Sequence, residues 1–203
     1  MPTASVLHFP SEEKVPEGKQ HLRLRTALYE ILELAFGSQH GVGSDQFVYW
    51  DATDPRRCLA PDAFVRLGGP NDVFRVWKVW ERGAPHVAVE IISATEREVD
   101  QEAQLARYRQ MGVAELVRFD CDDAERPLRV WDRTDDDLVE RTLGRPNSAE
   151  CRPLGVFWVV VDDPLLGRAL RPASDSEGRD LLPTPVEKAE ARIRELEEEL
   201  RRR

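Results

Sequence analysis

The chain has 203 residues, of which 41% are hydrophobic and 33% charged, and its formal net charge at pH 7 is −9. This composition is typical of a soluble globular protein, and the length suits one domain with an additional tail. No window approaches the roughly 18 apolar residues of a membrane-spanning helix, so an integral membrane protein is excluded. The acidic balance also excludes nucleic-acid binding through a general basic surface, because that binding relies on Lys and Arg to neutralise phosphates.

The cysteines and the amino terminus predict the cellular setting. Cys58, Cys121 and Cys151 form neither a disulfide framework nor a zinc-binding pattern. The first 16 residues lack the basic start and apolar run of a signal peptide. We therefore expect a reducing, cytoplasmic setting and no contact with a membrane.

The predicted elements are short apolar strands and two helices. Near-helical spacing of apolar residues predicts a helix over residues 17–36, which ends at Gly37 and leads into a glycine-rich turn. A second helix is predicted over residues 98–111. Apolar runs bounded by turn residues predict strands at 47–50, 63–67, 87–92, 115–120, 128–133, 138–143 and 156–161, while 73–80 fits a strand or an irregular segment. This order predicts an α/β (α+β) fold with a mixed β-sheet flanked by helices.

Three further segments surround the predicted domain of residues 17–170. Residues 1–16 are expected to form a flexible arm, and residues 171–185, rich in Pro, Ser and Gly, a linker. Residues 186–203 have a heptad pattern of apolar residues at Val186, Ala189, Ile193, Leu196 and Leu200. This C-terminal heptad helix either docks on its own domain or pairs as a coiled coil in a homodimer, and the pattern leaves both open.

Two carboxylates interrupt the apolar strands. Glu90 lies inside the run 87–92, and Asp62 directly precedes the run that begins at Ala63. An ionised carboxylate in an apolar strand is costly unless a cation or a metal ion compensates it. Two acids on neighbouring strands can meet and, with a backbone carbonyl, form an oxygen site suited to Mg²⁺ or Mn²⁺. A second explanation remains open, in which Glu90 pairs with a buried Arg and Asp62 caps a turn.

The order and spacing of these motifs resemble the Uma2 family of bacterial restriction endonucleases, which have the PD-(D/E)XK nuclease fold. The resemblance extends over about residues 20–165 and the charged heptad tail. Its motifs are residues 59–65 (LAPDAFV), 77–83 (WKVWERG), 89–93 (VEIIS), Asp100, Tyr108, Gly112-Val113 and Glu115.

The resemblance implies a restriction-endonuclease-like core and hydrolysis of phosphodiester bonds in nucleic acid, with DNA as the expected substrate. It also implies that Asp62 and Glu90 bind Mg²⁺ or Mn²⁺ and that the carbonyl of Ile91 is a further ligand. The two carboxylates are then expected within metal-bridging reach of each other.

The sequence departs from the family pattern at one position. The usual motif has a Lys two residues after the acid, and that position is Ile92 here. In proteins that the family resembles, this Lys lies on the following helix, at the place of Gln104. Asp100, Gln104 and Tyr108 are spaced i, i+4 and i+8 and share one helical face. Gln104 can orient a water molecule but brings no positive charge.

Two hypotheses of function follow. The first is a metal-dependent endonuclease with catalytic Asp62, Glu90 and Gln104, in which Lys78 or Arg107 supplies the missing charge. The second is a catalytically inactive interaction module that keeps the nuclease fold and assembles through its C-terminal helix. The missing Lys and the acidic surface favour the second, whereas the retained carboxylates favour the first.

Overall fold

A computed structural model describes residues 7–10, 18–92 and 101–202. Its centre is a six-stranded sheet with the order β1-β4-β6-β7-β8-β9. These strands are β1 (Gly41–Gly43), β4 (Ala63–Arg66), β6 (Val87–Ile92), β7 (Glu115–Asp120), β8 (Leu128–Thr134) and β9 (Asp137–Glu140). β6 and β7 run parallel, and the other neighbours are antiparallel. The mixed α/β fold expected from the sequence is therefore confirmed.

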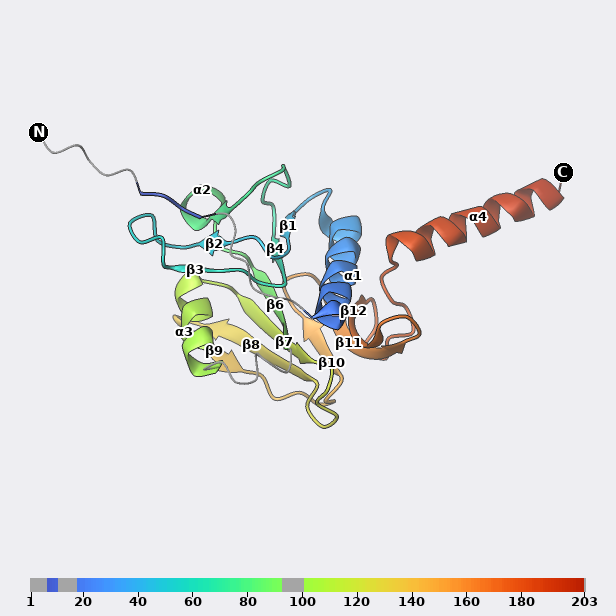
Figure 1. Cartoon of the computed structure of the whole chain (residues 1–203). Helices are drawn as coiled ribbons and strands as arrows, with labels where there is room; N and C mark the ends of the chain where they lie inside the picture. The colour runs from blue at the N-terminus through green and yellow to red at the C-terminus, as the bar shows by residue number, and fades with distance from the viewer. Residues whose placement is uncertain (1–6, 11–17, 93–100, 203) are drawn as a thin grey trace, which may run out of the picture.

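Both faces of the central sheet are covered, as Figure 1 shows. Helix α1 (Lys19–Phe36) packs on one face together with a three-stranded sheet. That sheet consists of β10 (Ser148–Cys151), β11 (Val156–Asp163) and β12 (Gly167–Ala173). On the other face lie α3 (Gln101–Met111) and a small sheet, with the short helix α2 (Val79–Arg82) beside it. The small sheet consists of β3 (Cys58–Leu59), β2 (Val48–Tyr49) and β5 (Trp77–Lys78).

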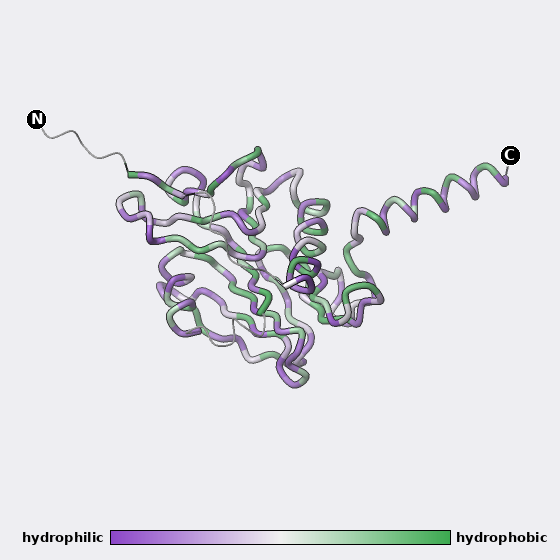
Figure 2. The backbone as a smooth tube through the Cα atoms, in the orientation of Figure 1, coloured by the Kyte–Doolittle hydropathy of each residue, from purple (hydrophilic) through white to green (hydrophobic). Residues whose placement is uncertain are grey.

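Strand β6 lies between the two hydrophobic cores, and all six of its residues are buried. Side chains alternate between the faces of a strand, so Val89 and Ile91 contribute to the core under α1, and Ala88 to the core under α3. By the same alternation Glu90 faces α3. A strand buried on both faces needs an apolar sequence, and Figure 2 shows hydrophobic colour along the central strands.

The long apolar strands were predicted best. β6 and β7 have the bounds expected from the sequence, and α1 begins two residues later than expected. Only Trp77–Lys78 of the run 73–80 is a strand, and α2 follows it directly. The sequence did not predict β1, β3, β10 or β12. Three of these are strands of two to four residues, and such short strands have no detectable period.

The last strand extends beyond the expected domain boundary. β12 runs to Ala173, and its last five residues are buried, so residues 171–173 belong to the sheet rather than to the linker. The N-terminal arm is described only at residues 7–10, where the ring of Phe9 packs edge-on against Tyr49.

Helix α4 (Pro185–Arg201) follows and leaves the body of the domain (Figure 1). Thr184 and Glu187 form a capping box at its first turn, which satisfies backbone N–H groups that lack helical partners. Buried Arg171 donates to Glu187 at 2.9 Å and to the carbonyl of Leu182 at 2.9 Å, so the start of α4 is fixed to β12. No helix in the described part of the chain combines the length and apolar character needed to cross a bilayer.

Glu115 on β7 is fully buried and connects the central sheet to the second sheet. Its Oε1 accepts from the indole N–H of Trp158 at 3.1 Å, and its Oε2 accepts from Arg141 at 2.9 Å. Trp158 is fully buried and its indole N–H depends on this carboxylate, whereas Arg141 also forms an ion pair with Asp132.

We expect Glu115→Ala to lower the free energy of unfolding by about 2 kcal/mol, because it leaves the buried indole N–H of Trp158 without its hydrogen-bond partner. Urea unfolding measures the change. Glu150→Ala, at an exposed position on β10, is the control and should change stability by less than about 0.5 kcal/mol. Equal stability of the two variants would contradict the assigned role of Glu115.

Candidate nuclease site

Asp62 lies at the start of β4, next to the strand that carries Glu90. The antiparallel register pairs Ala63 with Val89 and Phe64 with Ala88. Asp62 directly precedes Ala63, and Glu90 directly follows Val89, so both acids adjoin the same end of this ladder. Asp62 Oδ2 also accepts a hydrogen bond from the N–H of Ile91 at 2.7 Å. The strand pairing and this hydrogen bond bring Asp62 to the part of β6 that carries Glu90, and a metal-bridging distance between the two carboxylates stays a prediction.

Helix α1 holds the other oxygen of Asp62. Oδ1 lies 2.8 Å from Nε2 of His21 and 3.9 Å from Nε of Arg25, which is one helical turn further on. Arg25 also donates to the hydroxyl of Ser44 at 3.3 Å, and that hydroxyl donates to the backbone carbonyl of Asp62 at 2.7 Å. Asp62 is 6% exposed, and these contacts provide the hydrogen bonds that its burial requires.

Asp45 belongs to the rim of this cluster. Its side chain is exposed and lies 3.6 Å from Arg25, and its backbone has a positive φ of 66°. The N–H of Asp45 donates to the carbonyl of Pro61 at 2.8 Å, which joins this turn to the residue before Asp62. The turn after β1 therefore closes one side of the site.

Glu90 is 5% exposed and receives a hydrogen bond on Oε1 from the hydroxyl of Tyr108 on α3. Tyr108 is fully buried, and burial raises its pKa well above 10.0, helped by the negative charges of Glu90 and Asp62. The phenol therefore stays protonated and remains a donor.

Gln104 lies one helical turn before Tyr108, on the same face of α3. Its Oε1 accepts a hydrogen bond from Nη2 of Arg118 at 2.9 Å. Arg118 stands beside Glu90 in the parallel pairing of β6 with β7. The structure thus brings Gln104 to the same site as Glu90, and it adds a buried cation.

The two cations considered from the sequence hold other partners. Lys78 forms an ion pair with Glu81 at 3.1 Å, and Arg107 donates to the carbonyl of Cys58. Asp100 and Ser93, which belong to the expected motif, lie outside the described residues.

Sequence reasoning missed His21 and Arg118. His21 is 41 residues from Asp62, and nothing local in the sequence indicates their contact. Arg118 did give a signal, since it is a charge between the apolar residues 116–117 and 119, as Glu90 is inside the run 87–92. The pairing of β6 with β7 is needed to show that Arg118 and Glu90 are neighbours.

The donor set fits a hard divalent cation. Among the described residues no group of three or more His, Cys, Asp and Glu side chains is arranged to hold a metal ion. Mg²⁺, however, is commonly bound through one or two carboxylates, with water and substrate phosphate as its remaining ligands. The buried pair Asp62 and Glu90 meets that requirement, and the carbonyl of Ile91 remains a predicted ligand.

Residues 12–159 match the model of the Uma2 family, whose description is "Putative restriction endonuclease". The chain belongs to the Uma2 family. Among solved structures, it is similar to "a putative nuclease belonging to DUF820" from Anabaena variabilis, with 12% sequence identity and a TM-score of 0.48. That match covers 77% of this chain and 78% of the other. No curated protein sequence matches the chain.

Membership of the Uma2 family confirms the resemblance on which the site was predicted. The matched segment contains α1, both carboxylates and all of α3, so every side chain of the cluster described above falls within it. The segment ends inside β11, so β12 and α4 lie outside the matched residues.

The protonated state of Tyr108 can be tested by titration. Because its pKa is raised well above 10.0, this phenol should not ionise in the native protein around pH 10, where ordinary tyrosines do. The native phenolate absorbance of Tyr108→Phe should therefore overlay that of the wild type near this pH. In denaturant the variant should lack the signal of one of the three tyrosines.

Tyr29→Phe is the matched control, on the half-buried face of α1. In the native state this variant should show one phenolate fewer than the wild type. The difference should appear at a somewhat higher pH than for an ordinary tyrosine, because burial and the charge of Glu33 raise the pKa of Tyr29. A native Tyr108→Phe protein that loses one phenolate near pH 10 would show that Tyr108 is not the buried donor of Glu90.

Proposed function

We propose that this Uma2 protein is a metal-dependent endonuclease that hydrolyses phosphodiester bonds in nucleic acid, with DNA as the expected substrate. The observation that carries the proposal is the pair of buried carboxylates, Asp62 and Glu90, on adjacent strands. Burying two acids near each other is costly, and a metal ion bound by both would offset part of that cost. The family match and this retained pair favour a nuclease over a non-catalytic module.

Each residue of the proposed site has a role that its contacts support. Asp62 and Glu90 would hold Mg²⁺ or Mn²⁺, with the carbonyl of Ile91 as a further ligand. The N–H of Ile91 and the hydroxyl of Tyr108 fix the directions of the two carboxylates. The bound metal would polarise a phosphoryl oxygen and lower the pKa of a water molecule.

Gln104 completes the proposed set of catalytic residues. It is half-buried on the face of α3 that also carries Tyr108, so its amide can reach the reacting groups near Glu90. Such an amide can hold a water molecule or a phosphate oxygen by hydrogen bonds, but it cannot act as a general base.

We expect Asp62→Asn and Glu90→Gln each to reduce cleavage of plasmid DNA in Mg²⁺ or Mn²⁺ by at least about 10²-fold. Calorimetry with the metal alone should show that both variants also lose metal binding. Glu81→Gln, an exposed acid on α2, should keep both properties. Parallel assays with single-stranded DNA and with RNA identify the substrate class.

Cleavage that survives a chelator, or a Glu90→Gln protein that cleaves like the wild type, would contradict metal-dependent catalysis at this site. Metal binding that is absent in the wild type would do the same. Cleavage of RNA alone would leave the site assignment intact and correct the expected substrate.

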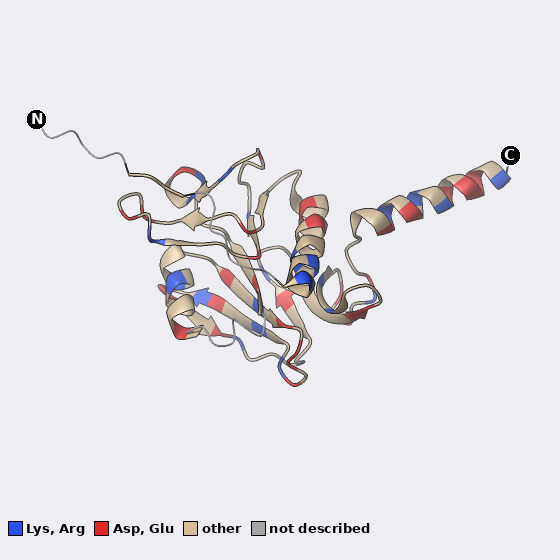
Figure 3. Ribbon diagram, viewed as in Figure 1, with Lys and Arg blue, Asp and Glu red and all other residues tan. Residues whose placement is uncertain are grey.

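The C-terminal helix supports a homodimer as part of the proposal. Four apolar residues on one side of α4 are 41–70% exposed, namely Val186, Ile193, Leu196 and Leu200. A stripe with heptad spacing is the pattern that pairs two helices in a coiled coil. Figure 3 shows that the remaining surface of α4 is densely charged with both signs.

The charges beside this stripe favour a parallel pair. In the heptad, Arg192 occupies a g position and Glu197 the e position that would face it from a parallel second copy. An antiparallel pair would instead bring the e residues Glu190 and Glu197 of the two copies together, which is repulsive. A parallel pair places both domains at the same end, where two sites can engage one duplex and gain from effective concentration.

Sedimentation of the full-length protein at tens of micromolar tests this pairing. We expect a dimer for the wild type and a monomer for Ile193→Glu/Leu196→Glu, which puts charges into the seam. Arg192→Glu should weaken the dimer by roughly 0.5 kcal/mol per lost ion pair, and Arg192→Glu/Glu197→Arg should restore it. A wild-type monomer, or a dimer that tolerates the two seam charges, would contradict assembly through α4.

A further inference from the structure

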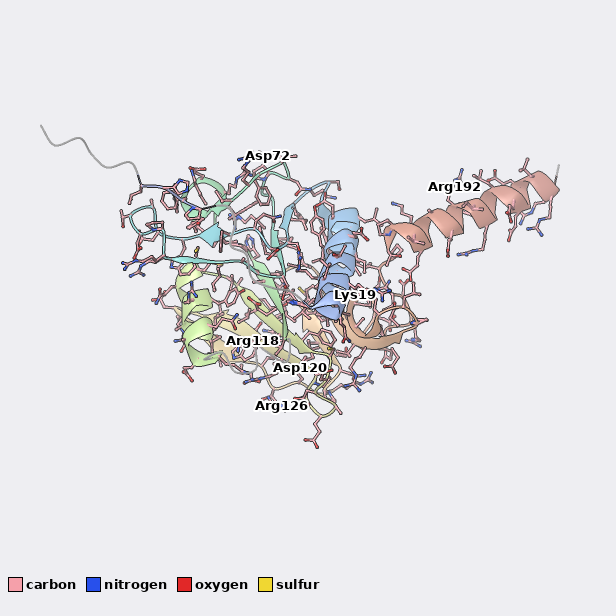
Figure 4. The ribbon with its side chains drawn as sticks, viewed as in Figure 1. Lys19, Asp72, Arg118, Asp120, Arg126 and Arg192 are labelled. Atoms are coloured by element: carbon pink, nitrogen blue, oxygen red, sulfur yellow. The ribbon has the colours of Figure 1, made fainter. Side chains whose placement is uncertain are left out.

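Arg118 is a buried guanidinium on the α3 face of the sheet, and it is 4% exposed. It lies beside Glu90 in the strand pairing, and its guanidinium stands 5.1 Å from the centre of the Trp131 ring. Figure 4 shows Arg118 in the body of the domain, in contrast to Arg192 on α4. Burying a guanidinium costs several kcal/mol, so its position calls for a physical reason.

The contacts of Arg118 leave part of its hydrogen-bonding capacity unused. Nη2 donates to Oε1 of Gln104 at 2.9 Å and to the carbonyl of Gln101 at 3.2 Å. Its Nε is buried and has no hydrogen-bond partner within the described ranges. Burial lowers the pKa of Arg118, while the charge of Glu90 acts in the opposite direction. Arg141 differs from Arg118, because the guanidinium of Arg141 forms ion pairs with Asp132 and Glu115.

The contact with Arg118 fixes the orientation of the Gln104 amide. A guanidinium has only donors, so the amide atom that faces it must be the oxygen. The amide nitrogen of Gln104 therefore keeps its two N–H donors for other partners. A cation at the oxygen also polarises the amide and strengthens those donors in a site of low dielectric.

We propose that Arg118 is the positive charge of the candidate site and acts through Gln104, whose amide N–H donates to a non-bridging phosphate oxygen of the substrate. Arg118 is then a positioning residue, and Gln104 is the group that touches the substrate. Negative charge builds up on the phosphoryl oxygens during hydrolysis, and a polarised donor aimed at them stabilises that charge. The inference rests on the proposed nuclease function.

The same arrangement gives a physical reason why position 104 is not a Lys. A Lys there would bring an ammonium group close to Arg118, whose Nη2 now lies 2.9 Å from the amide oxygen of Gln104. Two like charges at that distance repel strongly in a buried site. Arg118 and a Lys at position 104 are therefore mutually exclusive ways to supply one positive charge.

A set of full-length variants tests the inference by exchanging the charge between the two positions. Arg118→Lys keeps a cation and Arg118→Gln removes it with little change in size. Gln104→Lys adds a cation beside Arg118, and Arg118→Gln/Gln104→Lys moves the cation to the helix. Arg129→Gln is the matched control, because Arg129 lies 4.7 Å from the same Trp131 ring but pairs with Glu140.

Two quantities are measured, after urea unfolding has shown that each variant is folded. The first is the affinity for a labelled DNA duplex in Ca²⁺, followed by fluorescence anisotropy at several salt concentrations. The second is the cleavage rate in Mg²⁺. We expect Arg118→Gln to bind about 10-fold more weakly and to cleave about 10²-fold more slowly. Its salt dependence should fall by roughly one phosphate contact.

The other variants separate charge from packing. Arg118→Lys should retain the salt dependence and most of the affinity. Gln104→Lys alone should bring no gain, whereas the double variant should recover binding and cleavage to within about 10-fold of the wild type. Arg129→Gln should behave like the wild type in both assays.

Three results would overturn the inference. The first is a folded Arg118→Gln protein that binds DNA with wild-type affinity and salt dependence, because the cation would then be structural only. The second is a gain of cleavage from Gln104→Lys alone, and the third is a double variant no better than Arg118→Gln.

If the wild type binds DNA and the exchange restores binding but no variant cleaves, the nuclease proposal fails while the phosphate contact stands. If the wild type neither binds nor cleaves, both fail.

Discussion

The burial of charge at one point of the central sheet is the constraint on which the rest of the structure depends. Glu90 lies in a strand that is buried along its whole length, and an uncompensated carboxylate there would be prohibitively costly. Neighbouring elements supply the compensation. Tyr108 donates a hydrogen bond to Glu90 from α3, and Arg118 stands beside Glu90 on β7. Asp62, directly before β4, adds a second negative charge and is itself compensated by His21 and Arg25 of α1. The helices on the two faces of the sheet are thus both required at the same place.

β7 carries a second buried charge, and the comparison separates two roles that look alike in the sequence. Glu115 and Arg118 are both charges in one apolar run, but alternation along the strand directs them to opposite faces of the sheet. Glu115 faces the second sheet, where both of its oxygens have close partners, Trp158 and Arg141, and it holds two layers together. Arg118 faces α3 and lies beside Glu90 and Gln104, two residues of the candidate site.

The sequence predicts features that depend on neighbouring residues, but not those that depend on contacts between distant segments. The strands over residues 87–92 and 115–120 have long apolar runs, and their bounds were predicted correctly. Asp62 and Glu90 were recognisable because an acid in an apolar strand is unusual by itself. β12 was missed because Arg171 and Pro172 look like linker residues in isolation, whereas pairing with β11 makes them a buried strand. The partners of the acids, His21 and Arg118, depend on which strands and helices meet, which no local pattern contains.

Helix α1 shows how a chain of net charge −9 provides positive charge where the site needs it. Its first half contains Lys19, Arg23 and Arg25, and its second half contains Glu30 and Glu33. Figure 3 shows this division along the helix. The helix macrodipole disfavours a positive charge in the first turn, so Lys19 weakens the isolated helix by about 0.5 kcal/mol.

A violated local preference commonly marks a functional site. Here the violation brings His21 and Arg25 to Asp62, and it places Lys19 and Arg23 on the exposed side of the same helical turns. Positive charge is thereby concentrated beside the buried carboxylates, although the chain as a whole is acidic. Attraction between exposed charges is screened beyond about 10 Å at moderate ionic strength. In the proposed nuclease, this local arrangement rather than the net charge would therefore govern the approach of a phosphate backbone to the site.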